Sequence, residues 1–461
     1  MKILFLAAEA TPFIKVGGLG DVAGALPAAL RRRGLDVRLM VPRYGNVDPG
    51  KWGLTKVLDN FPVQMDWRRE ECQLLASPDG QSFFLENQYF FGSRGRAYGE
   101  DDDPERFVLF ARAAIEACRY LNWWPDVIHA HDWHSAAAIR INWAAKPRSG
   151  LVFTIHNIAH QGMCANSKWP LLGVYNAMGH LNLMEQAIYA ADVITTVSPT
   201  YANEIRTREY GFGLDSILWQ RSDRLVGILN GIDTDSWNPA TDDELAANYD
   251  AGHLQGKARC KAHLQKKMGL AVNADAPLIG VVSRLDDQKG ISLIVDSLGD
   301  ILALTNAQLM VLGSGHDAYE NAFRRATYHH PDRIANYIGF NAGLAREVYA
   351  GSDIFLMPSS FEPCGLSQMI AMRYGTLPVA RATGGLVDTV RDRVHDDGVG
   401  YLFGPYDKGS MLWGLGRALH DYWDRGSWEA AMRRAMSLDF SWDRSAARYQ
   451  EIYQRAVDVS R

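Results

Sequence analysis

Short apolar runs alternate with amphipathic stretches along the chain. Residues 3–8 form the first apolar run, and residues 22–33 follow with apolar positions at helical spacing. Asp21 is placed to cap this helix and Gly34 to end it, and the next apolar run covers residues 37–41. Strands that alternate with helices in this way are joined by right-handed crossovers. The opening of the chain therefore predicts a doubly wound, parallel α/β sheet.

Two series of such strands are predicted. In the first half of the chain, further runs of apolar and β-branched residues cover 127–130, 152–155, 193–197 and 225–229. A second series covers 278–282, 308–312, 334–339, 354–357 and 377–380. Each series predicts one Rossmann-like domain. Because such sheets bind ligands beyond the carboxyl ends of their strands, we expect the two domains to face each other across a deep cleft.

The boundary between the two domains is predicted from a loss of apolar periodicity. Between residues 238 and 257 the sequence is rich in Pro, Asp, Asn and Gly, which is typical of a surface crossing between domains. We therefore expect domains at residues 1–240 and 241–441. Beyond Trp442, apolar residues recur at helical spacing, so residues 442–461 are predicted to form an amphipathic helix.

The composition is that of a globular protein. The 461 residues are 47% hydrophobic and 22% charged, which excludes disordered, collagen-like and fibrous proteins. With 48 basic and 53 acidic residues the formal charge is −5, so no net positive field attracts nucleic acid or an anionic membrane. The five cysteines are too widely spaced for a disulfide framework or a zinc knuckle and favour a reducing compartment. No apolar run reaches the roughly 18 residues of a membrane span, so we expect a soluble, cytoplasmic protein.

A glycine-rich loop follows the first strand. It contains Lys15, Gly17, Gly18 and Asp21 and leads into the first helix. Glycines let the backbone approach a ligand, and a helix N-terminus presents free N–H groups, so this loop is a candidate anion site. The alternative is a tight strand-to-helix turn with an exposed lysine.

The densest cluster of titratable side chains follows the strand at 127–130. It comprises His129, His131, Asp132 and His134. A metal-dependent hydrolase is one interpretation, although the H-x-H-x-D-H pattern would need an aspartate where Trp133 stands. A carboxylate at a strand end suits acid–base chemistry or sugar-hydroxyl binding instead. In the remaining interpretation, His129 and His131 are hydrogen-bonded core residues and His134 starts a helix.

The strand at 152–155 delivers three further polar side chains. His156, Asn157 and Gln161 offer donors and acceptors without fixed charge, as a polyhydroxylated ligand requires. Each could equally structure its own loop.

In the second half, cations and a carboxylate follow two strands. Arg284 and Lys289 bracket a loop that enters a helix and could clamp a diphosphate, unless they form surface ion pairs with neighbouring aspartates. Glu362 follows the strand at 354–357, with the N–H groups of residues 365–367 opening the next helix. The Gly-Gly turn after Thr383 adds another phosphate-facing candidate.

Several motifs together resemble the bacterial glycogen synthase and plant starch synthase family. The resemblance runs from Lys2 to about the last helix. The motifs, in chain order, are Lys15-Val-Gly-Gly-Leu with Asp21, His129-Ala-His-Asp-Trp-His, Phe153-Thr-Ile-His-Asn, Asn230-Gly-Ile-Asp, Ser283-Arg-Leu with Gln288-Lys-Gly, Glu362-Pro-Cys-Gly-Leu, Thr383-Gly-Gly-Leu and Asp439-Phe-Ser-Trp.

The resemblance implies a glycosyltransferase with two Rossmann-like domains of the glycosyltransferase-B type. Its C-terminal helix would pack back on the N-terminal domain. It would transfer glucose from ADP-glucose to the non-reducing-end 4-hydroxyl of an α-1,4-glucan such as glycogen, with retention of configuration, in glycogen biosynthesis. No cofactor or metal is implied. The donor and the glucan are the implied partners, with no nucleic acid and no membrane.

The resemblance also implies roles for single residues. Arg284 and Lys289 would neutralise the departing phosphates, and Lys15 would approach the diphosphate from the opposite domain. The carbonyl of His156 would lie near the reacting carbon, and Phe340, where the family often has Tyr, would stack on adenine. The implied catalytic residues are Lys15, Asp132, His156, Arg284, Lys289 and Glu362. The implied substrate-binding residues are Gly17, Gly18, Asp21, Asn157, Gln161, Asn230, Phe340, Cys364, Gly365, Leu366, Ser367 and Thr383.

One departure favours the glucan-synthase branch. Related sucrose and trehalose-type transferases usually carry a second glutamate eight residues after the first, and Ile370 occupies that position here. A donor of UDP-glucose or a small acceptor remains an alternative, as do the metal-dependent hydrolase and a glucan-binding regulatory protein that has lost activity.

Overall fold

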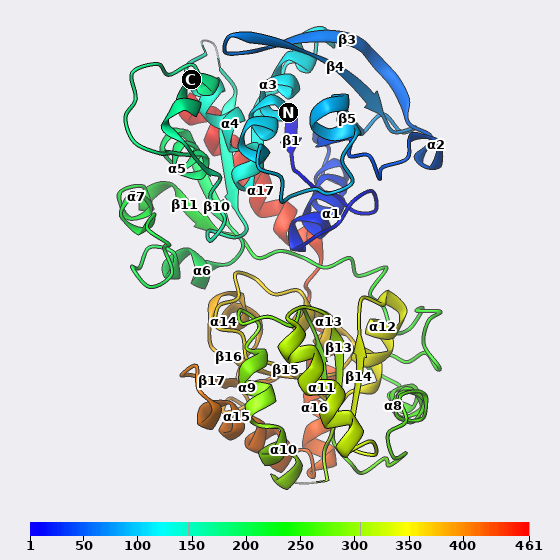
Figure 1. The fold of residues 1–461 in the computed structure, drawn as a ribbon. Coiled ribbons are helices and arrows are strands. Elements are labelled where there is room, and N and C mark those ends of the chain that lie inside the picture. The colour runs from blue at the N-terminus through cyan, green and yellow to red at the C-terminus, as the bar shows by residue number, and fades with distance from the viewer. Residues whose placement is uncertain (146–147, 305, 461) are drawn as a thin grey trace. The chain divides into compact units, whose positions relative to one another are not determined.

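The computed structural model describes residues 1–145, 148–304 and 306–460 (Figure 1). The chain divides into two compact units. Unit 1 consists of residues 1–231 together with the C-terminal helix α17 (Trp442–Ser460), and unit 2 consists of Ile232–Ser441. The predicted domain ranges also include residues 146, 147, 305 and 461, which lie outside the described residues.

Unit 1 is built on a nine-stranded sheet with the order β11-β10-β7-β6-β1-β2-β5-β4-β3. Neighbouring strands from β11 to β5 are parallel, whereas β4 is antiparallel to both β5 and β3. The strand order reverses between β1 and β6, which makes their carboxyl ends the ligand-binding edge of an open α/β sheet. The strands are β1 (Lys2–Leu6), β2 (Asp36–Pro42), β3 (Thr55–Met65), β4 (Arg68–Ala76), β5 (Ser82–Glu86), β6 (Val127–His131), β7 (Gly150–Ile155), β10 (Val193–Thr196) and β11 (Leu225–Gly227).

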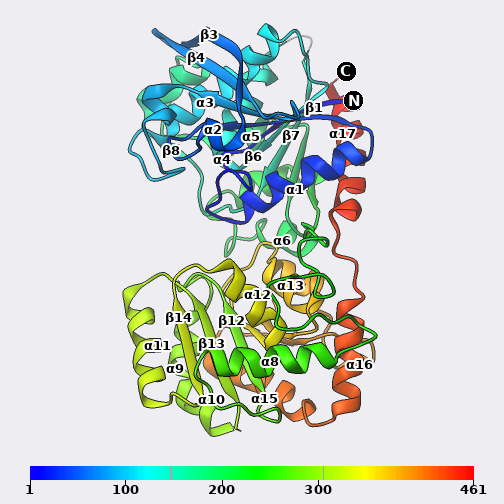
Figure 2. The same ribbon diagram turned by 90° about the vertical axis from the view of Figure 1, so that its right-hand side faces the viewer.

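Helices cover both faces of this sheet (Figure 2). On one face α17 packs against α1 (Gly18–Arg32) and β7. On the other face lie α3 (Asp103–Tyr120), α4 (Asp132–Trp143) and α5 (Leu183–Ala190). The central strands are buried between these layers, which is why they form continuous apolar runs in the sequence. Shorter elements of unit 1 are α2 (Pro49–Trp52), β8 (Met163–Cys164), β9 (Leu181–Asn182), α6 (Pro199–Glu204) and α7 (Asp215–Gln220).

The antiparallel extension by β3 and β4 has no counterpart in the predicted strand series. β3 lies at the edge of the sheet with most of its residues exposed, and β4 opens on the charged run Arg68-Arg69-Glu70-Glu71. Neither strand therefore shows a long apolar run.

Unit 2 contains a parallel six-stranded sheet with the order β14-β13-β12-β15-β16-β17. The order reverses between β12 and β15, so their carboxyl ends form the expected ligand-binding edge of this unit. The strands are β12 (Leu278–Val282), β13 (Gln308–Gly313), β14 (Ile334–Ile338), β15 (Ile354–Met357), β16 (Leu377–Arg381) and β17 (Tyr401–Phe403). The helices are α8 (Gln255–Lys267), α9 (Ile291–Asp296), α10 (Leu298–Leu304), α11 (Asp317–His329), α12 (Ala342–Gly351), α13 (Ser367–Arg373), α14 (Gly384–Thr389), α15 (Lys408–Asp421) and α16 (Arg425–Met436). The predicted Rossmann-like fold of both halves is confirmed.

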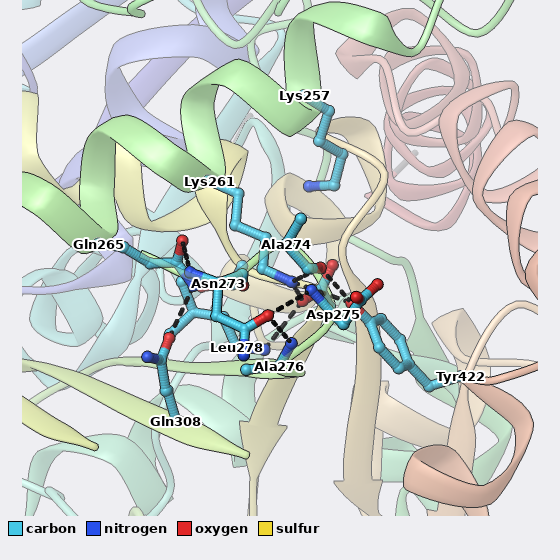
Figure 3. A network of polar contacts seen from close by, with 12 residues as sticks. Lys257, Lys261, Gln265, Asn273, Ala274, Asp275, Ala276, Leu278, Gln308 and Tyr422 are labelled. Carbon is cyan, nitrogen blue, oxygen red and sulfur yellow. Dashed lines mark hydrogen bonds and ion pairs between the residues drawn. The ribbon is translucent and has the colours of Figure 1, made fainter. Parts of the chain in front are cut away.

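Buried polar side chains fasten α8 to the sheet of unit 2 (Figure 3). Lys261 forms an ion pair with Asp353 at 2.7 Å and donates to the hydroxyl of Tyr422 at 2.9 Å. Gln265 donates to the side-chain oxygen of Gln308, the first residue of β13, at 2.7 Å. These contacts fix the amino ends of the strands and leave the carboxyl ends to the loops that carry the candidate site.

Unit 2 begins at Ile232, earlier than the predicted boundary at 240–241. The N–H of Ile232 donates to the carbonyl of Phe440 at 2.8 Å, and Arg346 of α12 forms an ion pair with Asp242 at 2.9 Å. Residues between Ile232 and Asp242 therefore make specific contacts within unit 2, so this stretch is part of the unit and not a free linker.

Among the described residues, none of the helices combines the length and the apolarity needed to cross a membrane.

Candidate active site

The loop after β1 is held by a buried carboxylate that the sequence analysis did not single out. Glu9 is 3% exposed, and its Oε2 accepts hydrogen bonds from the N–H groups of Val16 and Gly17, the latter at 3.0 Å. Burial raises the pKa of Glu9, although these two hydrogen bonds oppose the effect. The signal in the sequence is a carboxylate directly beyond a buried strand at the switch point.

Lys15 and Asp21 form an ion pair within this loop. The Nζ of Lys15 lies 2.7 Å from Oδ1 of Asp21, and the lysine side chain is 45% exposed. The prediction that Asp21 caps the helix is wrong, because α1 begins at Gly18 with the extended residue Gly17 as its N-cap. Gly18 has open space where a side chain would project. Its surroundings leave room for a ligand to approach the backbone.

Asp132 begins α4 directly after β6. Its φ of +54° lies in the left-handed region, a strained conformation for a residue other than glycine. Its Oδ1 accepts the N–H of His156 at 2.7 Å and that of Asn157 at 3.3 Å. Burial raises the pKa of this carboxyl to about 7, despite the two hydrogen bonds. The carboxyl group therefore joins the loops after β6 and β7 and titrates near neutral pH.

The other polar side chains after β7 differ in their charge and in their hydrogen bonds. Burial lowers the pKa of His156 to about 3, so the ring is neutral at physiological pH. The side-chain oxygen of Asn157 accepts the N–H of Ala159 at 3.0 Å. Gln161 donates to the carbonyls of Ile158 and Phe212 and accepts from Asn182, so its amide structures the loop in this conformation.

Asn230 lies beyond the end of β11. Its side chain is 7% exposed, and its side-chain oxygen is buried without a hydrogen-bond partner in the described part of the chain. A buried acceptor of this kind is free to receive a hydroxyl donor.

The histidine cluster is part of the core of unit 1. The two ring nitrogens of His129 lie 2.8 Å from the hydroxyl of Tyr453 and 2.7 Å from that of Thr154, so both are occupied. Nδ1 of His131 lies 2.9 Å from Nε2 of His156. The ring of His134 stacks on Tyr98, with centroids 4.4 Å apart. Across residues 1–145, 148–304 and 306–460, no group of three or more His, Cys, Asp and Glu side chains is arranged to hold a metal ion.

In unit 2 the loops after β12 and β15 meet through an ion pair. Nζ of Lys289 lies 2.6 Å from Oε2 of Glu362, which also accepts the hydroxyl of Ser359 at 3.0 Å. An added Cβ at Gly290, which has a φ of +68°, would lie 2.0 Å from the carbonyl oxygen of Pro358, so a glycine is required where the two loops pack. Arg284, 63% exposed, forms a 2.8 Å ion pair with Asp286.

A small pocket of about 70 Å³ opens at this edge of the sheet. Its polar lining comes from Ser283, Lys289, Ser359 and Ser367, and residues of β12 and β15 form its apolar walls. The pocket therefore lies at the switch point of unit 2, with the lysine at its side and the start of α13 beside it.

The remaining predicted residues of unit 2 fall into two groups. The turn at Thr383 packs onto the loop after β15, because Gly385 donates its N–H to the carbonyl of Glu362 at 3.0 Å. Gly365 has a φ of +72° and lies just before α13, whose N-cap is Leu366. Phe340, by contrast, is 86% exposed on the loop after β14. Cys364, Gly365, Leu366 and Ser367 follow Glu362 into α13, and Thr383 precedes the Gly-Gly turn that packs on Cys364 and Glu362.

Comparison with known proteins agrees with this geometry. Residues 2–220 match the starch synthase catalytic domain family, and residues 265–435 match the glycosyl transferases group 1 family. A glycogen synthase of Anaeromyxobacter sp. (strain Fw109-5) is 46% identical over 98% of this chain and 99% of its own length. The glycogen synthase of Bacillus subtilis (strain 168) is 41% identical over 100% of this chain and 99% of its own length.

The chain belongs to the glycogen and starch synthase family. It is a glycosyltransferase. The structure is similar to the solved catalytic domain of starch synthase IV from Arabidopsis thaliana bound to ADP and acarbose, with a TM-score of 0.92, 36% identity and 99% coverage of both chains. The resemblance inferred from the motifs is thus confirmed.

A more distant likeness shows the shared fold alone. A sucrose-phosphate synthase from Thermosynechococcus elongatus matches with a TM-score of 0.65 at 18% identity, covering 98% of both chains. In this member of the glycogen and starch synthase family, Ile370 is buried within α13. An apolar core residue therefore stands eight positions after Glu362.

Proposed function

We propose that this glycosyltransferase transfers glucose from ADP-glucose to the non-reducing-end 4-hydroxyl of an α-1,4-glucan, with retention of configuration. The observation that carries the proposal is the arrangement at the two switch points. Lys15 follows the strand at one switch point, and Lys289, paired with Glu362, follows the strand at the other. The glycogen synthases and the ADP-bound starch synthase named above support the choice of donor and acceptor.

In unit 2, Arg284 and Lys289 act on the diphosphate. Both side chains are already matched by carboxylates, so the loop is stable before the donor arrives. A diphosphate offers more charge than one carboxylate and draws the two cations to its oxygens. Because these cations are in place when the bond to glucose breaks, they stabilise the departing ADP as its negative charge develops. The N–H groups at Leu366 and Ser367 add donors beside the pocket.

In unit 1, Lys15 and the loop at Gly17 and Gly18 are the groups that bind phosphate of the donor. Asp132 and His156 bind the glucose. The ionised carboxylate of Asp132 accepts a sugar hydroxyl, and the carbonyl of His156 faces the reacting carbon. Asn230 adds a buried hydrogen-bond acceptor in unit 1, and Glu362 adds a carboxylate in unit 2, each suited to a sugar hydroxyl. The bond between the glucose carbon and the diphosphate oxygen breaks as the acceptor hydroxyl forms the new glycosidic bond on the same face. The proton of the hydroxyl passes to an oxygen of the departing diphosphate.

The proposed reaction needs no metal, because the arginine and lysine side chains neutralise the charge of the diphosphate. ADP release from ADP-glucose, measured in EDTA with and without glycogen, tests the whole reaction. We expect release to depend on glycogen and to be much slower with UDP-glucose. Release at the same rate without glycogen would refute the transfer to a glucan, and equal rates with both donors would refute the donor assignment.

The hydrolase alternative finds no support in the site. Both ring nitrogens of His129 bond to protein hydroxyls, and one nitrogen of His131 is engaged by His156. The ring nitrogens of His129, and one ring nitrogen of His131, therefore already bond to protein groups.

A further inference from the structure

Glu9 lies where its carboxylate can hold the conformation of the loop after β1. It lies between the strand and α1, and its buried carboxylate bonds to two successive backbone N–H groups of the loop. An added Cβ at Gly20 would lie 3.2 Å from Oε2 of Glu9 and 3.2 Å from Cγ of Lys15. The carboxylate, the start of α1 and the stem of Lys15 are therefore in close packing.

The same contacts decide which backbone groups remain for a ligand. The N–H groups of Val16 and Gly17 are already taken by Glu9. Gly18 is the next residue, and it opens α1 with no atom within 4 Å of its missing side chain. A diphosphate that approaches this loop thus meets Gly18 and Lys15, while Glu9 holds the two preceding residues in place.

We propose that Glu9 is a positioning residue that holds the Lys15–Gly18 loop in the conformation that receives the diphosphate of the donor. This inference rests on the proposed function. Glu9 itself does not touch the donor. It acts through the two N–H groups, and its charge also acts on the neighbouring carboxyl of Asp132.

The charge of Glu9 is felt by several groups on the elements packed around it. Asp21 of α1 and Asp132 of α4 are near enough for like-charge repulsion, and Tyr98 bonds to the Glu9 carboxylate. Tyr44, which follows β2, is buried within reach of the same charge. Glu9 thus links the glycine loop to the acid that binds the sugar, because its negative charge contributes to the raised pKa of Asp132.

Two substitutions separate the contacts of Glu9 from its charge. In Glu9→Gln the amide oxygen still accepts both N–H groups, so we expect the KM for ADP-glucose to change less than about threefold. Removal of the charge lowers the pKa of Asp132, so the pH at which the rate rises as Asp132 ionises should shift to a lower value. In Glu9→Ala both N–H groups lose their partner, and we expect a KM for ADP-glucose and a Kd for ADP at least about tenfold higher.

Amide hydrogen exchange provides a readout without turnover. In Glu9→Ala the N–H groups of Val16 and Gly17 should exchange at least about tenfold faster than in the wild type. Asp126→Ala is the matched control, because the Asp126 carboxylate also accepts a backbone N–H, from Lys2, at the opposite end of β1. It should leave loop exchange and ADP affinity unchanged.

The outcomes distinguish the two proposals. Wild-type KM, ADP affinity and loop exchange in Glu9→Ala would overturn the positioning role while leaving the transfer reaction intact. If Glu9→Ala does not fold, Gly20→Ala displaces the carboxylate instead, because its Cβ would lie 3.2 Å from Oε2 of Glu9. Wild-type ADP affinity and loop exchange in Gly20→Ala would then overturn the role. Absence of transfer by the wild type would refute the proposed function, and ADP affinity with loop exchange would still report on Glu9.

Discussion

Nδ1 of His131 lies 2.9 Å from Nε2 of His156, and this contact joins the end of β6 to the first residue after β7. Burial lowers the pKa of His156 to about 3 and that of His131 well below its ordinary value, so the pair is neutral. Nε2 of His131 is buried with no hydrogen-bond partner among the described residues. A proton there would leave an unpaired N–H, so we infer that Nδ1 of His131 donates to His156.

Substitution of His131 should therefore lower turnover more than binding. In His131→Ala the ring of His156 loses the contact that fixes it, and a displacement of about 1 Å at a reacting group costs up to about 100-fold in rate. We expect kcat to fall between about 10-fold and 100-fold and the KM for ADP-glucose to change little. His134→Phe is the control, because the ring of His134 packs by stacking on Tyr98 and a phenyl ring can keep that packing. An equal loss in both variants would contradict the role of His131.

The activity should rise with pH through about 7 because Asp132 ionises there. The burial that raises its pKa to about 7 keeps the carboxyl protonated below that pH, when it cannot accept a sugar hydroxyl at that oxygen. His131 and His156 stay neutral over the same range and add no limb. The pH dependence of kcat/KM for ADP-glucose, measured from pH 5.5 to 8.5, checks this expectation.

Asp132→Asn should abolish that limb and leave a low, flat profile. The free energy of unfolding changes in the opposite direction to the activity. Because the pKa of Asp132 is raised in the folded protein, its contribution to stability is fully present below about pH 4 and is lost as the pH rises through about 7. The wild type should therefore lose stability relative to Asp132→Asn over this window. A limb near pH 7 that persists in Asp132→Asn would assign the titration to another group.

The fold was largely predictable because its central strands are buried on both faces. The predicted ranges 278–282 and 354–357 coincide with β12 and β15, whose apolar residues need no alternation. The antiparallel strands β3 and β4 could not be predicted in the same way, since exposed and charged positions interrupt their apolar pattern.

The residues of the candidate site were predictable as types at strand ends, but their contacts were not. Lys289 and Glu362 are 73 positions apart in the sequence. Their loops are brought together by the packing of Gly290 on Pro358 and by the hydrogen bond from the N–H of Ser360 to the carbonyl of Gln288, at 2.8 Å. Glu9 was missed because a single carboxylate after a strand carries no spacing signal. Gln161 shows the reverse case, a polar residue whose amide is occupied by its own loop.

The Lys289–Glu362 pair gives a prediction for leaving-group stabilisation. Lys289→Met removes the cation and leaves Glu362 buried without it, so we expect kcat/KM to fall by at least about 100-fold. Glu362→Gln should also reduce the rate, and the double variant should be no worse than Lys289→Met alone, because residues that act as a unit are not additive.

Lys408→Met provides the matched control for this pair in unit 2. Lys408 also forms a 2.7 Å ion pair, with Asp300, but on the surface. Its loss should leave kcat/KM for ADP-glucose within about twofold of the wild type. Additive losses in the Lys289 and Glu362 double variant would show that the two side chains act separately.

The stability of unit 2 should depend on pH through Lys257. Its buried ammonium donates to the carbonyls of Ala350 and Tyr374 and to the hydroxyl of Thr376, at 2.9, 3.0 and 2.7 Å. Burial lowers the pKa of Lys257 to about 7, whereas the pKa of a lysine in an unfolded chain is about 10.4. Between these values the unfolded chain binds more protons, so stability rises with pH, and below about pH 7 the folded protein carries the full cost of the buried charge.

Lys257→Met should remove this dependence. Between pH 7 and 9 we expect the free energy of unfolding of the wild type to rise relative to that of Lys257→Met, by on the order of 1–3 kcal/mol. Urea denaturation at the two pH values measures the difference. Lys267→Met, on the same helix, is the control because Lys267 pairs with Glu347 with its side chain 47% exposed and should show no such shift. A difference between wild type and Lys257→Met that does not change with pH would mean that Lys257 stays protonated, held by the carbonyls at the ends of α12 and α13.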